Sequence, residues 1–169
     1  MKRMLWLLFS LLLISSVALA DHIGIYSDAT GTSCSLTPGF NTTATVIHKF
    51  ASGAVGSDFN LAFPPGTSFF SFNSPYYICG VAGCPEPFSL AYGQCRAGNI
   101  VLGTINAIYG TGTAQVVHSN LFANIQYTDC SFAFHSATGG SAYVGTTGNC
   151  DEPLPVEPST WGSVKSLYR

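Results

Sequence analysis

Residues 98–130, GNIVLGTINAIYGTGTAQVVHSNLFANIQYTDC, decide the fold class of this 169-residue chain. The stretch opens with an apolar run, Ile100 to Tyr109, followed by a Gly110-Thr111-Gly112 turn and two further strand-like pieces. In the last piece, residues 121–128 alternate between apolar and mostly polar side chains, which is the period-two pattern of a strand with one face on a core. The stretch therefore predicts the central part of a β-sheet protein.

Short strand-like segments separated by Gly, Pro, Ser and Asp turns flank this stretch on both sides. Because the run from Ile100 to Tyr109 is apolar on both faces, it is expected to be an interior strand. The whole pattern predicts an all-β fold, a single β-sandwich of about seven or eight short strands spanning residues 21–150. Strands are expected at residues 23–27, 42–50, 57–63, 68–72, 100–109, 114–118, 121–129 and 141–146, with a small-residue turn at 52–56 and a long loop at 73–93 that holds at most one short strand, 76–79.

The first 20 residues have the three parts of a secretory signal peptide. Lys2 and Arg3 are the basic region, Met4 to Ile14 the apolar region, and Ala18-Leu19-Ala20 the cleavage site, so Asp21 would be the first mature residue. The apolar run is shorter than the roughly 20 residues of a membrane-spanning helix. The sequence thus predicts a secreted or cell-surface protein, with the periplasm as an alternative, and no transmembrane segment in the mature chain.

The mature chain is poor in charge, with four Lys or Arg residues against eight Asp or Glu residues and a net charge of −4. Nucleic-acid binding depends on Lys and Arg at the phosphates, and binding to anionic lipid depends on basic clusters. The composition therefore argues against both kinds of partner and leaves an extracellular protein or a glycan.

All six cysteines follow the predicted signal peptide, and an even number in an exported chain predicts disulfides. They are Cys34, Cys79, Cys84, Cys95, Cys130 and Cys150. Six cysteines allow 15 connectivities, among which the sequence alone cannot choose; our interpretation pairs Cys79 with Cys84, Cys130 with Cys150 and Cys34 with Cys95. The chain has no C-x-x-C motif and its four histidines are scattered, so we expect no metal site and no cofactor.

The sequence offers little for catalysis, and we expect a protein that is not an enzyme, with a secreted hydrolase as the less favoured reading. No G-x-S-x-G motif is present, and nucleophilic catalysis needs a Ser or Cys beside a base. Glycoside hydrolysis needs two carboxylates in opposed environments. The carboxylates between residues 23 and 150 are Asp28, Asp58, Glu86 and Asp129. His48 shares the more apolar face of its strand, which favours a hydrogen-bonded histidine at the core edge over a catalytic one.

Aromatic residues in and near the long loop are candidate sugar-binding platforms, and Tyr76, Tyr77 and Tyr92 are the proposed binding residues, with Phe88 beside them. The alternative is that these rings cover the end of the sandwich. Asp28 precedes a glycine turn and is expected to bond the backbone of that turn; a calcium site formed with Thr30 is the second reading.

The composition shifts after Cys150. Residues 151–158 hold three prolines and three carboxylates, which predicts an extended spacer. Residues 159–169 are expected to form a short amphipathic helix capped by Ser159 and Thr160. We interpret this segment as a recognition or sorting tag, and the alternative is a helix that packs back on the sandwich. The tag residues would be Trp161, Val164, Lys165, Leu167, Tyr168 and Arg169.

Several short motifs resemble a loose group of uncharacterised exported bacterial proteins. They are IGIYSD at 23–28, TVIHK at 45–49, AYGQC at 91–95, TDC at 128–130 and STWGSVKSLYR at 159–169. The architecture is also similar to cohesin-like sandwiches, which implies extracellular protein docking. With these resemblances, we expect a secreted or cell-surface, non-catalytic binding or structural protein that takes part in docking, and a carbohydrate-binding module is the alternative. No functional residue is carried over from either group.

Overall fold

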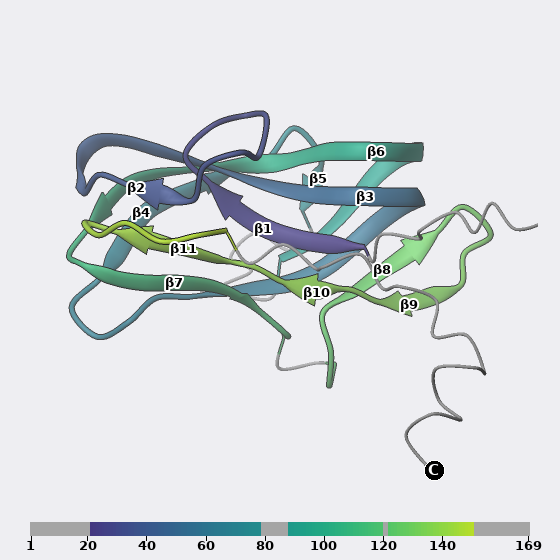
Figure 1. Cartoon of the computed structure of the whole chain (residues 1–169). Helices are drawn as coiled ribbons and strands as arrows, with labels where there is room; N and C mark the ends of the chain where they lie inside the picture. The colour runs from purple at the N-terminus through teal and green to yellow at the C-terminus, as the bar shows by residue number, and fades with distance from the viewer. Residues whose placement is uncertain (1–20, 79–87, 120–121, 151–169) are drawn as a thin grey trace, which may run out of the picture. The chain divides into compact units, whose positions relative to one another are not determined.

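Two long strands, β3 and β6, carry the fold, and shorter strands pair with them or with each other (Figure 1). The computed structural model describes residues 21–78, 88–119 and 122–150, and every regular element in these ranges is a strand. The strands are β1 (His22–Tyr26), β2 (Ser35–Leu36), β3 (Gly39–Ala62), β4 (Ser68–Asn73), β5 (Tyr77–Ile78), β6 (Phe88–Tyr109), β7 (Gly112–Val117), β8 (Gln126–Asp129), β9 (Phe134–Ser136), β10 (Thr138–Gly139) and β11 (Ser141–Val144). The predicted all-β class is confirmed for these residues.

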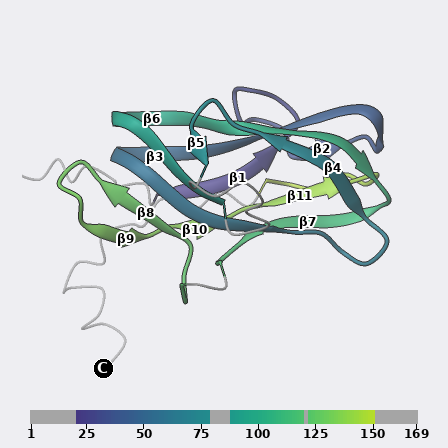
Figure 2. The same cartoon turned by 180° about the vertical axis from the view of Figure 1, so that it is seen from behind.

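The strands form one curled sheet in which β3 is central. β3 pairs antiparallel with β1, β6 and β8 and then, through Asn60–Ala62, with β7. β4 and β5 extend the sheet beyond β6, while β11 and β2 extend it beyond β7. Figures 1 and 2 show β3 and β6 running across one layer and β7 and β11 across the other. The two predicted layers are therefore two parts of a single 11-stranded sheet rather than two separate sheets.

The core lies between these two parts. Its members come from both layers and include Ile23 of β1, Val46 of β3, Leu102 of β6, Val116 of β7 and Val144 of β11, all of which are buried. Each such aliphatic side chain contributes roughly 1.5–3 kcal/mol when it is removed from water. The alternating apolar residues of the sequence thus supply the inner faces of the curled sheet.

The predicted turn at 52–56 is wrong, because these residues continue β3. Register shifts between Ala51 and Ala54, and again between Ala54 and Gly56, mark β-bulges that bend the long strand. At Gly56 the neighbouring strand is so close that an added Cβ would lie 2.7 Å from the carbonyl oxygen of Leu90. The small residues of this segment therefore allow close strand packing and curvature, not a chain reversal.

The expected burial of residues 100–109 on both faces is also wrong, because Val101 and Tyr109 are exposed. Two register shifts, between Val46 and Ile47 and between Gly39 and Thr43, change which face of β6 meets the core, so Ile105 and Ile108 join Ile100 and Leu102 in the core. Two boundaries differ as well. Residues 88–93 of the predicted loop belong to β6, and within the described residues 122–129 of the strand predicted at 121–129, only Gln126–Asp129 is regular.

Two disulfides are present among the described residues, with a pairing that corrects the sequence interpretation. Cys34 bonds Cys150 and Cys95 bonds Cys130, each pair with its Cα atoms 5.4 Å apart. Ala54 of β3 pairs with both Arg96 and Asp129, so Cys95 and Cys130 flank the same strand. The parallel pairing of β2 with β11 similarly brings Cys34 near the segment that follows β11. The number of residues between the two cysteines of each pair does not predict that they lie close together.

Several predictions fall outside the described residues. They concern the signal peptide at 1–20, the Cys79–Cys84 pair and Glu86, the spacer at 151–158 and the tail at 159–169. Within the described ranges, no helix has the length and hydropathy needed to cross a membrane.

Candidate binding groove

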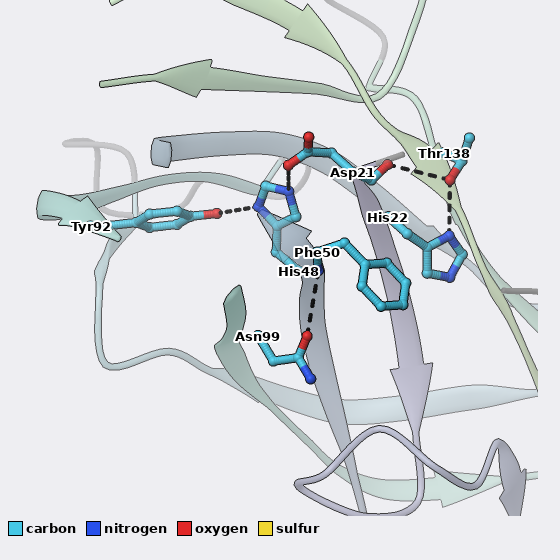
Figure 3. A network of polar contacts seen from close by, with 7 residues as sticks. All are labelled: Asp21, His22, His48, Phe50, Tyr92, Asn99 and Thr138. Atoms are coloured by element: carbon cyan, nitrogen blue, oxygen red, sulfur yellow. Dashed lines mark hydrogen bonds and ion pairs between the residues drawn. The ribbon is translucent and has the colours of Figure 1, made fainter. Parts of the chain in front are cut away.

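His48, the histidine that the sequence analysis considered, lies in a network of polar contacts (Figure 3), and its side chain is buried. The Nε2 atom of His48 lies 2.9 Å from Oδ1 of Asp21, and its Nδ1 atom lies 3.3 Å from the hydroxyl oxygen of Tyr92. Because a carboxylate oxygen accepts, Nε2–H donates to Asp21 and Nδ1 is left to accept from the tyrosine hydroxyl. Burial raises the pKa of Tyr92, which keeps this hydroxyl protonated and donating.

The network around His48 fastens the start of β1 to the sheet. The ring of Tyr127 packs edge-on against His48 with centroids 5.3 Å apart, and the side chain of His48 is fully buried. On the other side of Asp21, its carbonyl oxygen accepts from the backbone N–H of Thr138 at 3.0 Å, and the Thr138 hydroxyl lies 2.9 Å from Nδ1 of His22. The prediction of a hydrogen-bonded histidine at the core is confirmed, and no substrate can reach its ring in this arrangement.

Tyr92, predicted as a binding residue, is buried, which corrects that prediction. Its ring lies 4.9 Å from the ring of Tyr76, and the guanidinium carbon of Arg96 lies 5.2 Å from the Tyr76 ring centroid. Phe88 packs against Phe72, with centroids 4.6 Å apart. These rings cover the core, as the alternative interpretation had it. The side chain of Tyr77 is outside the described part, although its backbone pairs with β6.

Asp28 organises the loop that follows β1. One carboxylate oxygen accepts from the backbone N–H and the hydroxyl of Thr30, and the other accepts from the N–H of Ser33 at 2.7 Å. These bonds, led by the Thr30 hydroxyl, hold the pKa of Asp28 far below its ordinary value. The predicted turn role is confirmed, and the carboxylate is already engaged by the loop that it closes. In the described part of the chain, no group of three or more His, Cys, Asp or Glu side chains is placed to hold a metal ion.

A different surface, on the outer face of β3, β6 and β8, has the form of a binding site. Two adjoining hollows, with volumes of about 330 and 590 Å³, share Gly56, Leu90, Ala91 and Thr128 in their linings. Three phenylalanines border them: Phe122 and Phe134 line the first hollow and Phe132 the second. Phe132 is 77% exposed, Phe134 70% and Phe122 39%. We call this surface, with its three rings and the strand residues between them, the aromatic groove.

The loop between β8 and β9 holds Phe132 in place. The carboxylate of Asp129 accepts from the backbone N–H groups of Ser131 and Ala133, both at 2.8 Å, and from His135 Nε2 at 2.9 Å. The bond from Ala133 and then that from His135 lower the pKa of Asp129. Phe132 itself adopts a φ of 65°, which is rare for a bulky residue and persists only where surrounding structure fixes it.

The Cys95–Cys130 disulfide joins this loop to β6, and both of its cysteines line the second hollow. The bond therefore fixes one wall of the aromatic groove relative to its floor. The loop geometry and the disulfide together fix the backbone that carries this exposed ring.

The floor of the groove combines small and polar side chains. Asp58 lies between Ser89 of β6 and Gln126 of β8 in the strand register, and the Ser89 hydroxyl donates to Oδ2 of Asp58. The other carboxylate oxygen, Oδ1, is covered from solvent and has no hydrogen-bond partner among the described residues. Of the four carboxylates considered in the sequence, the structure places Asp58 at this groove.

Sequence reasoning missed the three phenylalanines. Phe122 fell within a predicted regular strand, and Phe132 and Phe134 fell between two predicted strands with no assigned role. The available signal was the sequence Cys130-Ser131-Phe132-Ala133-Phe134, in which two large apolar residues follow a cysteine directly after a strand. Large apolar side chains in a turn next to a disulfide are candidates for side chains that are held exposed to solvent.

Comparison with known proteins finds one distant structural likeness. No protein-family model and no curated protein matches the chain. Among solved structures, the chain is similar to a cohesin module from a Clostridium perfringens family 33 glycoside hydrolase, at 7% identity and a TM-score of 0.49 over 75% of this chain and 97% of that one. Of the two resemblances noted in the sequence, only the cohesin-like one has a counterpart here. It is distant, and we base no functional argument on it.

Proposed function

We propose that this protein is a non-catalytic binding protein that works outside the cell and engages its partner through the aromatic groove. The observation that carries the proposal is the exposure of Phe122, Phe132 and Phe134 around one hollowed surface. Exposed apolar groups that gather at one place on a soluble protein mark interaction sites. The disulfide-fixed loop at Phe132 supports recognition because a preorganised surface loses little entropy on binding.

Two further features support the extracellular, non-catalytic part of the proposal. Disulfides persist in oxidising compartments outside the cytosol, and the pairing of Cys34 with Cys150 spans most of the domain. In the lining of the groove, Asp58 is the sole acid and no histidine lies beside it. A hydrolase needs a second catalytic group there, which disfavours the secreted-hydrolase alternative.

Replacing Phe132 and Phe134 by serine should abolish most binding to the partner. We expect at least about a tenfold weaker retention of the purified mature chain on cells of the producing organism, since exposed aromatic anchors carry much of the energy at interfaces. The matched control is Phe70→Ser, because Phe70 is 80% exposed but lies on β4, at the other end of the long strands from β8 and β9 (Figures 1 and 2). Equal retention of the double variant and the control would contradict the proposed function.

We also propose, from the sequence, that the C-terminal tail is a recognition or sorting tag. Its tag residues would be Trp161, Val164, Lys165, Leu167, Tyr168 and Arg169. Deleting residues 162–169 should release the protein from the cell surface into the medium, which fractionation and immunoblotting would measure. Unchanged localisation together with a lower melting temperature would leave only the packing alternative.

A further inference from the structure

The shape of the aromatic groove favours a linear ligand. Its two hollows share Gly56, Leu90, Ala91 and Thr128, so they adjoin each other along the strands instead of forming separate pits. Small residues make up much of the floor, with Gly56 of β3 beside Ala91 of β6 and Gly93 also in the lining. A floor of small residues lets a flat ligand group lie close to the sheet, and the three phenylalanines of the lining are available to contact that group.

The charges of the groove favour a neutral ligand. None of the described residues that line it is Lys, Arg or His, so an anionic ligand would find no counter-charge among them. The carboxylate of Asp58 is poorly presented to a cation, because one oxygen accepts the Ser89 hydroxyl and the other is covered from solvent. Ionic recognition of either sign therefore has no strong anchor here.

The polar groups of the groove suit a ligand rich in hydroxyl groups. Because the Ser89 hydroxyl gives its hydrogen to Asp58, its oxygen lone pairs remain as acceptors. Gln126, Thr128 and Gln94 add both donors and acceptors along the lining. Phe122, Phe132 and Phe134 add apolar faces, so the surface alternates between groups that bind hydroxyls and groups that bind C–H faces.

We propose that the aromatic groove binds a linear, neutral carbohydrate, with sugar rings against Phe132 and Phe134 and sugar hydroxyls bonded to Ser89, Gln126 and Thr128. This inference rests on the proposed function and names the ligand class of the same site. The sequence analysis placed a possible sugar-binding site at Tyr76, Tyr77 and Tyr92, and the present proposal places it at the aromatic groove. Asp58 acts as a positioning residue that orients the Ser89 hydroxyl.

Calorimetric titration of the mature chain with neutral hexasaccharides of glucose, xylose, mannose, galactose and N-acetylglucosamine tests the proposal. At least one of them should bind, and a hexasaccharide of uronic acids should bind at least about tenfold more weakly than the best neutral one. Gln126→Ala should weaken that best binding about tenfold, which corresponds to one or two lost hydrogen bonds, and Phe134→Ala should weaken it at least as much. Phe70→Ala serves as the matched control and should bind normally.

Gln126 is half-buried on the short strand β8, so its substitution keeps the test valid even if Phe134→Ala fails to fold. Absence of binding to every neutral hexasaccharide would overturn the carbohydrate assignment, and equal binding by Gln126→Ala and wild type would overturn the placement of the carbohydrate in this groove. If no neutral hexasaccharide binds but cell retention still depends on Phe132 and Phe134, the proposed function stands and the partner is a protein. If retention does not depend on them, the proposed function fails as well.

Discussion

Removing the Cys34–Cys150 disulfide by a double Cys→Ala substitution should lower the free energy of unfolding by about 5 kcal/mol, the largest loss expected from any single cross-link described here. The two cysteines are 116 residues apart in sequence, so their bond removes a large share of the conformational freedom of the unfolded chain. Urea denaturation under oxidising conditions would measure this loss of unfolding free energy from the midpoint and the slope of the unfolding transition. Oligosaccharide binding should survive wherever the variant remains folded, because neither cysteine lines the groove.

The Cys95–Cys130 disulfide provides the matched comparison. It spans 35 residues, so its removal should cost about 4 kcal/mol, somewhat less than removal of the first. Its variant should, however, lose groove binding at temperatures where it is still folded, because Phe132 is then free to move relative to β6. A Cys95→Ala, Cys130→Ala protein that binds like wild type would contradict the role given to the fixed loop, and a Cys34→Ala, Cys150→Ala protein of unchanged stability would contradict the first expectation.

The parts of the fold that could be predicted from the sequence are those set by local patterning. Residues 23–27, 68–72, 114–118 and 141–146 alternate or cluster their apolar side chains, and each overlaps an observed strand within two residues of its ends. Alternation depends only on neighbours along the chain, so a single sequence displays it directly. The buried, hydrogen-bonded state of His48 could be predicted for the same reason, because the residues two positions before and after it are apolar.

The parts that could not be predicted depend on which strands lie side by side. Ala54 pairs with Arg96 and Asp129 at once, and this meeting of three distant segments decides both the Cys95–Cys130 bond and the position of the groove. The composition of segment 52–56 predicts a turn although the segment is a strand, because small residues serve turns and close strand packing equally well. The exposure of Phe132 likewise follows from the loop geometry at Asp129, and the only hint of it in the sequence is the position of two phenylalanines shortly after Cys130.

Replacing His48 by leucine should cost about 3–5 kcal/mol of unfolding free energy, the typical result of removing one partner from a buried ion-paired or hydrogen-bonded group. His48 is fully buried and joins Asp21, which is 10% exposed, to Tyr92, which is 3% exposed. Leucine fills much of the space but leaves the Asp21 carboxylate and the Tyr92 hydroxyl without this partner. Urea titration of the variant gives the loss, and adding Tyr92→Phe should recover part of it, because the stranded hydroxyl is then absent.

Among the described residues, His135 and Asp129 form a second histidine–carboxylate pair, which serves as a control for the effect of burial on stability. Nε2 of His135 lies 2.9 Å from Oδ2 of Asp129, the same distance as Nε2 of His48 from Oδ1 of Asp21. The side chains of His135 and Asp129, however, are 45% and 26% exposed. His135→Leu should therefore cost less than about 1 kcal/mol, since water replaces the lost partner at an exposed pair. Equal losses for His48→Leu and His135→Leu would show that burial does not set the strength of the His48 network. In that case the anchoring of β1 would have to come from its ladders with β3 and β10 and from the Asp21–Thr138 backbone bond, all of which remain in both variants.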